Sequence, residues 1–73
     1  MSRIGTINHI NFQDRIGEIV DEHDQDIAFL LIDEYCSLHI GERVCFEIEL
    51  TNIGLLATNI KKLKDLDEND RGE

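Results

Sequence analysis

The 73-residue chain has few cationic side chains, only two cysteines and no long apolar run. A membrane-spanning helix needs about 20 consecutive apolar residues, so the sequence predicts none. The first five residues lack the apolar segment of a signal peptide, which favours a cytoplasmic location. Cys36 and Cys45 alone provide no disulfide framework, and we expect two reduced thiols.

The shortage of positive charge limits how strongly the chain can bind nucleic acid. Seven Lys and Arg stand against 16 Asp and Glu, which gives a net charge of −9. Residues 1–63 alone carry −6, so the acidity is not confined to the C-terminal residues. Binding to a phosphate backbone depends on clustered Lys and Arg, and in this part only Lys61 and Lys62 are adjacent. The composition therefore predicts weak electrostatic affinity for nucleic acid.

Catalytic and metal-binding motifs are also missing. The sequence contains no phosphate-binding glycine loop, no G-x-S-x-G and no persuasive Cys–His pair, so we expect no enzyme activity and no cofactor. His9, His23 and His39 lack the spacing of metal ligands. The acidic stretch 21–24 could hold a divalent cation weakly, but a solvated hairpin tip is the simpler interpretation.

The most informative stretch that is present runs from Asp26 to Asp33, with six apolar residues between the two aspartates. A half-buried strand alternates apolar and polar side chains, because successive side chains point to opposite faces. This stretch does not alternate, so we expect a strand that is apolar on both faces. Its outer face must be covered, bind a partner or remain an exposed apolar patch.

Five short apolar stretches separated by turn residues predict an all-β fold, a small five-stranded antiparallel OB-fold barrel over residues 1–63. An SH3-like barrel is the main alternative. The acidic residues 64–73 predict a disordered tail. Gly17 within the second strand indicates a bulge or a close approach, and Gly41 indicates a tight turn. The expected strands are 4–11, 15–20, 26–32, 43–50 and 55–63.

The cleanest alternation lies in the fourth predicted strand. Its apolar residues occupy every second position from Val44 to Leu50, which predicts one face toward the core and one toward solvent. The third strand should contribute its alternate apolar side chains to the same core. The expected core cluster is Ile7, Ile19, Ile27, Phe29, Val44, Phe46 and Ile48.

Segments across residues 5–63 share the spacing of a known family. Gly5-Thr6-Ile7 with Asn11 is similar to G-x-V-K-W-F-N, and Asp26-Ile27-Ala28-Phe29 is similar to D-V-F-V. Residues 38–47 are similar to L-x-E-G-Q-x-V-x-F-E, and residues 54–60 to G-P-x-A-x-N-V. The chain resembles the bacterial cold-shock proteins, which are OB-fold barrels that bind single-stranded nucleic acid and act in transcription and RNA metabolism.

The resemblance does not extend to the nucleic-acid platform of that family. Lys, Trp and Phe of the opening motif are replaced by Asn8, His9 and Ile10, and Glu18 adds a carboxylate to the centre of the sheet. Base stacking contributes roughly 1–3 kcal/mol per base, so the loss of several rings predicts weak or absent single-stranded nucleic-acid binding. The candidate residues for any remaining binding are Asn8, His9, Phe12 and Arg15.

The replacements suggest a different use of the face. Apolar residues rimmed by charge are typical of a protein contact, with a basic partner or a second copy of the chain. A face merely covered by the tail or a loop is the alternative interpretation, and residual single-stranded nucleic-acid binding is a third. The expected protein-contact patch is Ile10, Ile16, Glu18, Ala28 and Leu30.

Overall fold

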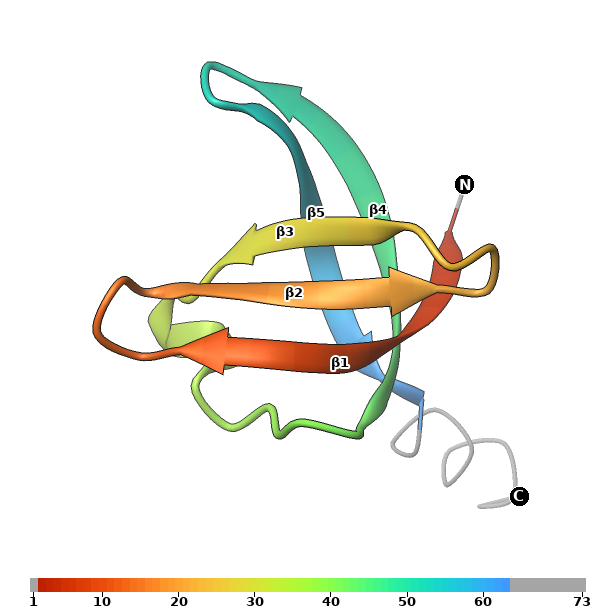
Figure 1. The fold of residues 1–73 in the computed structure, drawn as a ribbon, viewed down its shortest axis with the longest axis horizontal. Helices are drawn as coiled ribbons and strands as arrows, with labels where there is room; N and C mark the ends of the chain where they lie inside the picture. The colour runs from red at the N-terminus through yellow and green to blue at the C-terminus, as the bar shows by residue number, and fades with distance from the viewer. Residues whose placement is uncertain (1, 64–73) are drawn as a thin grey trace.

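The computed structural model describes residues 2–63, and these form an all-β fold of five antiparallel strands (Figure 1). The strand order in the sheet is β3-β2-β1-β4-β5. The predicted fold class, a small five-stranded antiparallel β structure, is therefore confirmed. The predicted tail, residues 64–73, lies outside the described residues. The strands are β1 (Arg3–Asn11), β2 (Ile16–Asp21), β3 (Asp26–Leu30), β4 (Arg43–Thr51) and β5 (Gly54–Lys62).

The strands form two layers. Strands β1, β2 and β3 lie side by side, and the β4–β5 hairpin crosses behind them (Figure 1). The edge strands β3 and β5 pack against each other, but no hydrogen-bonded ladder joins them within residues 2–63. The structure is thus a barrel-like sheet with one unpaired seam, and the sheet is not closed by hydrogen bonds.

Strand β1 connects the two layers and bends to do so. It pairs with β4 near its start and with β2 along its length. The register with β2 jumps from Ile7↔Ile19 to His9↔Glu18, which makes a β-bulge at Asn8. Bulges increase local twist and turn a strand. A Cβ atom added to Gly5 would lie 2.6 Å from the carbonyl oxygen of Val20, so β1 and β2 approach each other closely at a position where only glycine fits.

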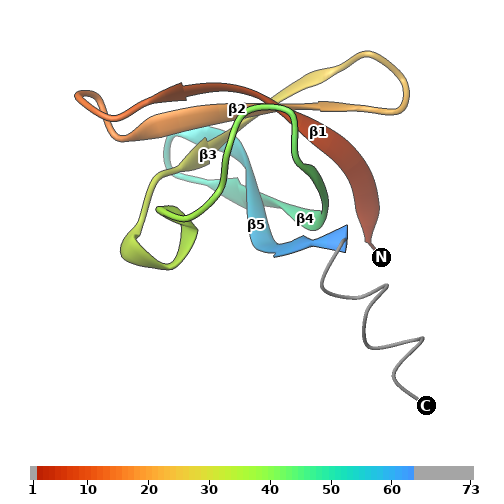
Figure 2. The same cartoon turned by 90° about the horizontal axis from the view of Figure 1, so that it is seen from below.

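The third strand ends two residues before the predicted boundary. It stops at Leu30 because the Ile32 N–H donates to the Leu30 carbonyl and turns the chain. The chain then forms a short 3₁₀-helix, η1 (Asp33–Tyr35), which closes one end of the fold (Figure 2). Tyr35 packs edge-on against Phe29, with ring centroids 6.0 Å apart. Its hydroxyl accepts a hydrogen bond from the Ile60 N–H.

The core contains the residues that the alternation predicted. Six of the seven expected side chains are buried in one cluster, and Ile48 is partly buried against it. Phe29 and Phe46 are the largest fully buried side chains. Gly17 is the predicted close approach, since an added Cβ would lie 2.4 Å from the Phe29 ring. The cluster also contains residues outside the expected set: Leu31, Leu38, Ala57 and Ile60.

One end of the fourth strand departs from the prediction. The alternation places Leu50 on the core-facing side, yet this side chain is 77% exposed. The tip of the β4–β5 hairpin projects past β3, so nothing in the front layer reaches it (Figure 1). Leu50 does lie on the same face of β4 as the core residues. It is not buried, because the β4–β5 hairpin extends beyond the layer of β1–β3 that would cover it.

Candidate functional site

The outer face of β1, β2 and β3 holds most of the residues that the sequence singled out. Directly paired residues in antiparallel strands lie on the same face, so the register assigns each face. Ile16 is paired with Leu30 and with Asn11, while Glu18 is paired with Ala28. These residues alternate with buried Gly17, Ile19, Ile27 and Phe29 and therefore lie on the outer face.

The structure removes Ile10 from this patch. Ile10 is paired with Gly17, which faces the core beside Phe29, and it packs against the core cluster. The prediction that Ile10 lies on the outer face beside Ile16 is wrong, because the bulge at Asn8 shifts the side chains of β1 by one position. Asn11 is the residue of β1 that pairs with Ile16, and His9 is the direct partner of Glu18.

The remaining patch is a strip of apolar side chains across β2 and β3. Leu30 is 44% exposed, and Ile16, Ala28 and Val20 are partly exposed. Glu18 lies in the middle of the strip, between His9 and Ala28. We define the outer strip as Ile16, Glu18, Val20, Ala28 and Leu30; Val20 was not in the predicted set, although its place two residues after Glu18 is the signal that could have added it.

The candidate nucleic-acid residues lie in β1 and in the turn between β1 and β2. Asn8 and His9 are exposed at and beside the β1 bulge, and Phe12 is 65% exposed in the turn between β1 and β2. Arg15 adopts a left-handed backbone conformation with φ of 59°. Its guanidinium lies 3.9 Å from the Asp33 carboxylate, so part of its charge is already compensated.

The same is true of most other cations. Four of the five basic side chains in residues 2–63 lie 3.5–3.9 Å from a carboxylate. Exposed ion pairs contribute little to stability, but each one reduces the positive field that a phosphate would meet. The described surface therefore offers little uncompensated positive charge. These pairs are Arg3–Asp21, Arg15–Asp33, Arg43–Glu22 and Lys62–Glu42.

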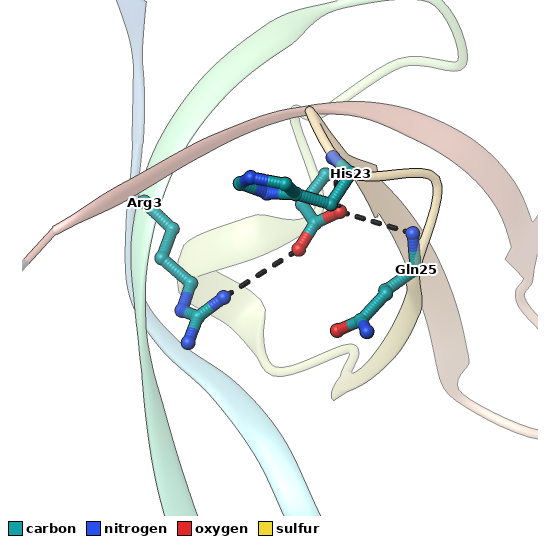
Figure 3. A network of polar contacts seen from close by, with 4 residues as sticks. Arg3, His23 and Gln25 are labelled. Atoms are coloured by element: carbon teal, nitrogen blue, oxygen red, sulfur yellow. Dashed lines mark hydrogen bonds and ion pairs between the residues drawn. The ribbon is translucent and has the colours of Figure 1, made fainter.

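Asp21 is the one buried polar side chain in the described core, and it organises the β2–β3 turn (Figure 3). Its Oδ1 accepts hydrogen bonds from the backbone N–H groups of His23 and Gln25, at 2.8 and 3.0 Å. Its Oδ2 lies 3.6 Å from the Arg3 guanidinium without a hydrogen bond. The Gln25 N–H is the main cause that holds the pKa of Asp21 below its ordinary value; burial opposes this, while His23 and Arg3 add to it.

A second carboxylate tethers the loop before β4. Partial burial would raise the pKa of Glu42, but the His39 N–H at 2.7 Å and the Lys62 ammonium at 3.5 Å lower it below its ordinary value. The ion pair connects this loop to the end of β5. Glu42 therefore has a structural role in holding the connection to β4.

Other chemistry finds no place in the described part of the chain. Within residues 2–63, no three His, Cys, Asp or Glu side chains are grouped so that they could hold a metal ion. Cys36 and Cys45 are free thiols. No helix among these residues is long and apolar enough to cross a membrane.

Comparison with known proteins identifies no family for this chain. A scan against protein-family models finds no match to the chain, and a search among curated proteins finds none.

Sequence reasoning missed one exposed apolar group. Leu50 and Leu55 are directly paired near the tip of the β4–β5 hairpin, with Ile53 in its turn. They are 77%, 61% and 69% exposed, more than any residue of the outer strip. Their adjacency in a short hairpin was visible in the sequence, but their exposure follows from the way the hairpin crosses the other strands and projects past β3 (Figure 1).

Proposed function

We propose that this chain is a non-enzymatic interaction module that binds a protein partner through its outer strip. The observation that carries the proposal is the Ile16–Leu30 pair, a cross-strand pair of large apolar side chains on a sheet face. Exposed apolar groups beside charged residues are a common basis of protein contacts. The strip is also built on regular strands, which hold its side chains rigidly.

The charge distribution favours a basic partner surface. Glu18 lies within the strip. Asp14 comes two residues before Ile16 in the sequence, and Asp26 is the direct partner of Val20 in β2. Complementary charge mainly sets the rate and orientation of association. A second copy of the chain is the other occupant to consider, although its net charge of −9 opposes close approach of two copies.

The resemblance to cold-shock proteins suggests where such a module acts. An OB-fold is a five-stranded, partly open barrel, and the observed strand order with an unpaired β3–β5 seam is compatible with it. On this basis we propose a role in transcription or RNA metabolism in the cytoplasm, with the partner held where that family binds nucleic acid.

Direct binding of single-stranded nucleic acid is the second candidate. It is favoured by the exposure of the Phe12 ring, since aromatic rings stack on bases, and by exposed His9 nearby in β1. It is disfavoured by Glu18 and by the pairing of Arg15 with Asp33. In OB-folds the face of strands 2 and 3 and the loop between strands 1 and 2 contact oligonucleotides, so the two candidates compete for one surface.

The double substitution Ile16→Lys with Leu30→Glu tests the proposal. We expect an unchanged circular dichroism spectrum, because both side chains lie on the outer face, and loss of the proteins that wild-type chain captures from cell extract. The matched control is Ile40→Glu, an exposed apolar residue outside the strip, which should keep those proteins. Retention of every captured protein by the folded double variant would contradict the proposal. A shift from dimer to monomer on sizing would instead assign the strip to a second copy.

A further inference from the structure

The distal half of the β4–β5 hairpin is a two-stranded ribbon with an unpaired edge. Strand β1 pairs with β4 only between Arg43 and Phe46, where Arg3 is the last partner. From Glu47 to Thr51, β4 has a strand neighbour only on the β5 side within residues 2–63. The backbone groups on its other side therefore form an open edge, which is a template for another extended chain.

The two faces of this edge differ in chemistry. Ile48 and Leu50 lie on the core-facing side, and Leu50 is paired with exposed Leu55. Glu47 and Glu49 lie on the opposite side and are exposed. No ion pair compensates either carboxylate within the described residues, and positions 47–60 contain no basic side chain. The edge thus alternates acidic and apolar side chains with the period of a strand.

The start of the open edge has room for a further chain. A surface hollow of about 530 Å³ lies where β1 begins, and Ile48 of β4 forms part of its wall. Arg3 and Ile4 line it from β1, Ser2 lines it from just before that strand, and Asp21 lines it from β2. Leu50 follows Ile48 on the same face, about 7 Å further along the strand. The hollow and the exposed Leu50–Leu55 pair are therefore continuous along β4.

We propose that the edge of β4 from Glu47 to Thr51 binds an extended segment of a protein partner by strand addition. The segment alternates basic and apolar side chains. Its main-chain groups hydrogen-bond to β4, its basic side chains lie beside Glu47 and Glu49, and its apolar side chains lie beside Ile48 and Leu50. A second copy of the chain does not fit as well, because its own Glu47 and Glu49 would bring like charges together on one face.

This surface differs from the outer strip and can be tested separately. The probe is a seven-residue peptide that alternates lysine and isoleucine, titrated into the full chain with backbone amide signals followed by NMR. Signals of Glu47–Thr51 should shift, while those of Ile16 and Leu30 should not. An otherwise identical peptide with glutamate in place of lysine should not bind. Shifts confined to the outer strip would overturn the assignment.

Variants separate the charge and the apolar contributions. Glu47→Lys with Glu49→Lys should weaken peptide binding by about tenfold or more, since cross-strand attraction becomes repulsion. Leu50→Asp should also weaken it and leave the fold intact, because Leu50 is largely exposed. The controls Ile40→Asp and Glu34→Lys are exposed sites away from the ribbon and should bind as the wild type does. Equal weakening by the controls would reduce the effect to net charge and overturn the proposal.

Peptide methylation tests the main-chain ladder without changing the protein. Alternate N–H groups of a strand point to the same edge. A peptide N-methylated at every isoleucine and one N-methylated at every lysine should therefore differ, with one losing binding and the other keeping it. Equal binding of both would overturn strand addition. Sedimentation measures whether the chain forms a dimer. A dimer that Leu50→Asp dissociates would show that the edge binds a second copy of the chain, and this would overturn the proposed partner.

Discussion

The inner and outer faces of the β1–β3 sheet carry similar apolar residues, but only those of the inner face are buried. The inner face carries Ile19, Ile27 and Phe29, all buried, and the outer face carries Ile16, Ala28 and Leu30, all partly exposed. What distinguishes the faces is the second layer, since β4 and β5 cover only one of them. Apolar composition therefore does not by itself make a side chain part of the core, and within residues 2–63 no second layer covers the outer strip.

The largest test of this comparison is the removal of an inner ring. Phe46→Ala should lower the free energy of unfolding by about 3–5 kcal/mol, because the truncation leaves a cavity in a close-packed core. Phe12→Ala removes an exposed ring and should change it by less than about 0.5 kcal/mol. Urea unfolding followed by circular dichroism measures both. Similar losses for the two variants would mean that Phe46 does not occupy the core.

The next test adds an atom between β2 and β3, where Gly17 is paired directly with Phe29. Gly17→Ala should destabilise the fold by about 1–3 kcal/mol, because the new methyl group would lie 2.4 Å from a Phe29 ring that is fully buried and packed against Tyr35. Glu18→Ala, the next residue but on the outer face, should cost less than about 0.5 kcal/mol. The midpoint of thermal unfolding compares them. A neutral Gly17→Ala would show that the ring can move aside.

The core, the bulge in β1 and the hairpin tip show how much of the structure could be predicted from the sequence. Alternation along β4 predicted the burial of Val44 and Phe46, because period two is a local property of a strand. The placement of Ile10 was wrong because a bulge adds one residue to one strand only, and nothing in I-N-H-I-N marks the extra residue. The exposure of Leu50 arises because the β4–β5 hairpin crosses the other strands and its tip projects past the edge strand β3 (Figure 1). Such long-range differences carry no local signal.

A smaller effect concerns the outer face and nucleic acid. We expect affinity for oligo-dT or oligo-U at physiological salt to be weaker than about 1 μM, because few rings are available for stacking and most cations are paired. Fluorescence anisotropy at several salt concentrations measures it. Sub-micromolar binding would favour the nucleic-acid candidate. Phe12→Ala and Arg15→Ala would then locate the contact, with Ile40→Ala as the control.

The smallest effect belongs to Asp21, the one polar residue on the inner side of this comparison. Its pKa is lowered in the folded state, so its charged form favours folding. That contribution is fully present above the ordinary value of 3.8 and is lost as pH falls through the lowered folded pKa. The Arg3 guanidinium and the His23 backbone N–H face the carboxylate, and both favour its charged form.

The measurement is an NMR titration of the Asp21 side-chain carboxyl carbon, with Asp26 as an exposed aspartate on the adjacent strand for comparison. Asp21→Asn keeps an oxygen that can accept from His23 and Gln25 but removes the charge. The difference in stability between wild type and this variant should therefore shrink as pH falls below 3.8. Glu42→Gln separates the similar contribution of Glu42, whose folded pKa is also lowered. A titration of Asp21 at or above its ordinary value of 3.8 would show that the hydrogen bonds of the β2–β3 turn do not stabilise the charged carboxylate.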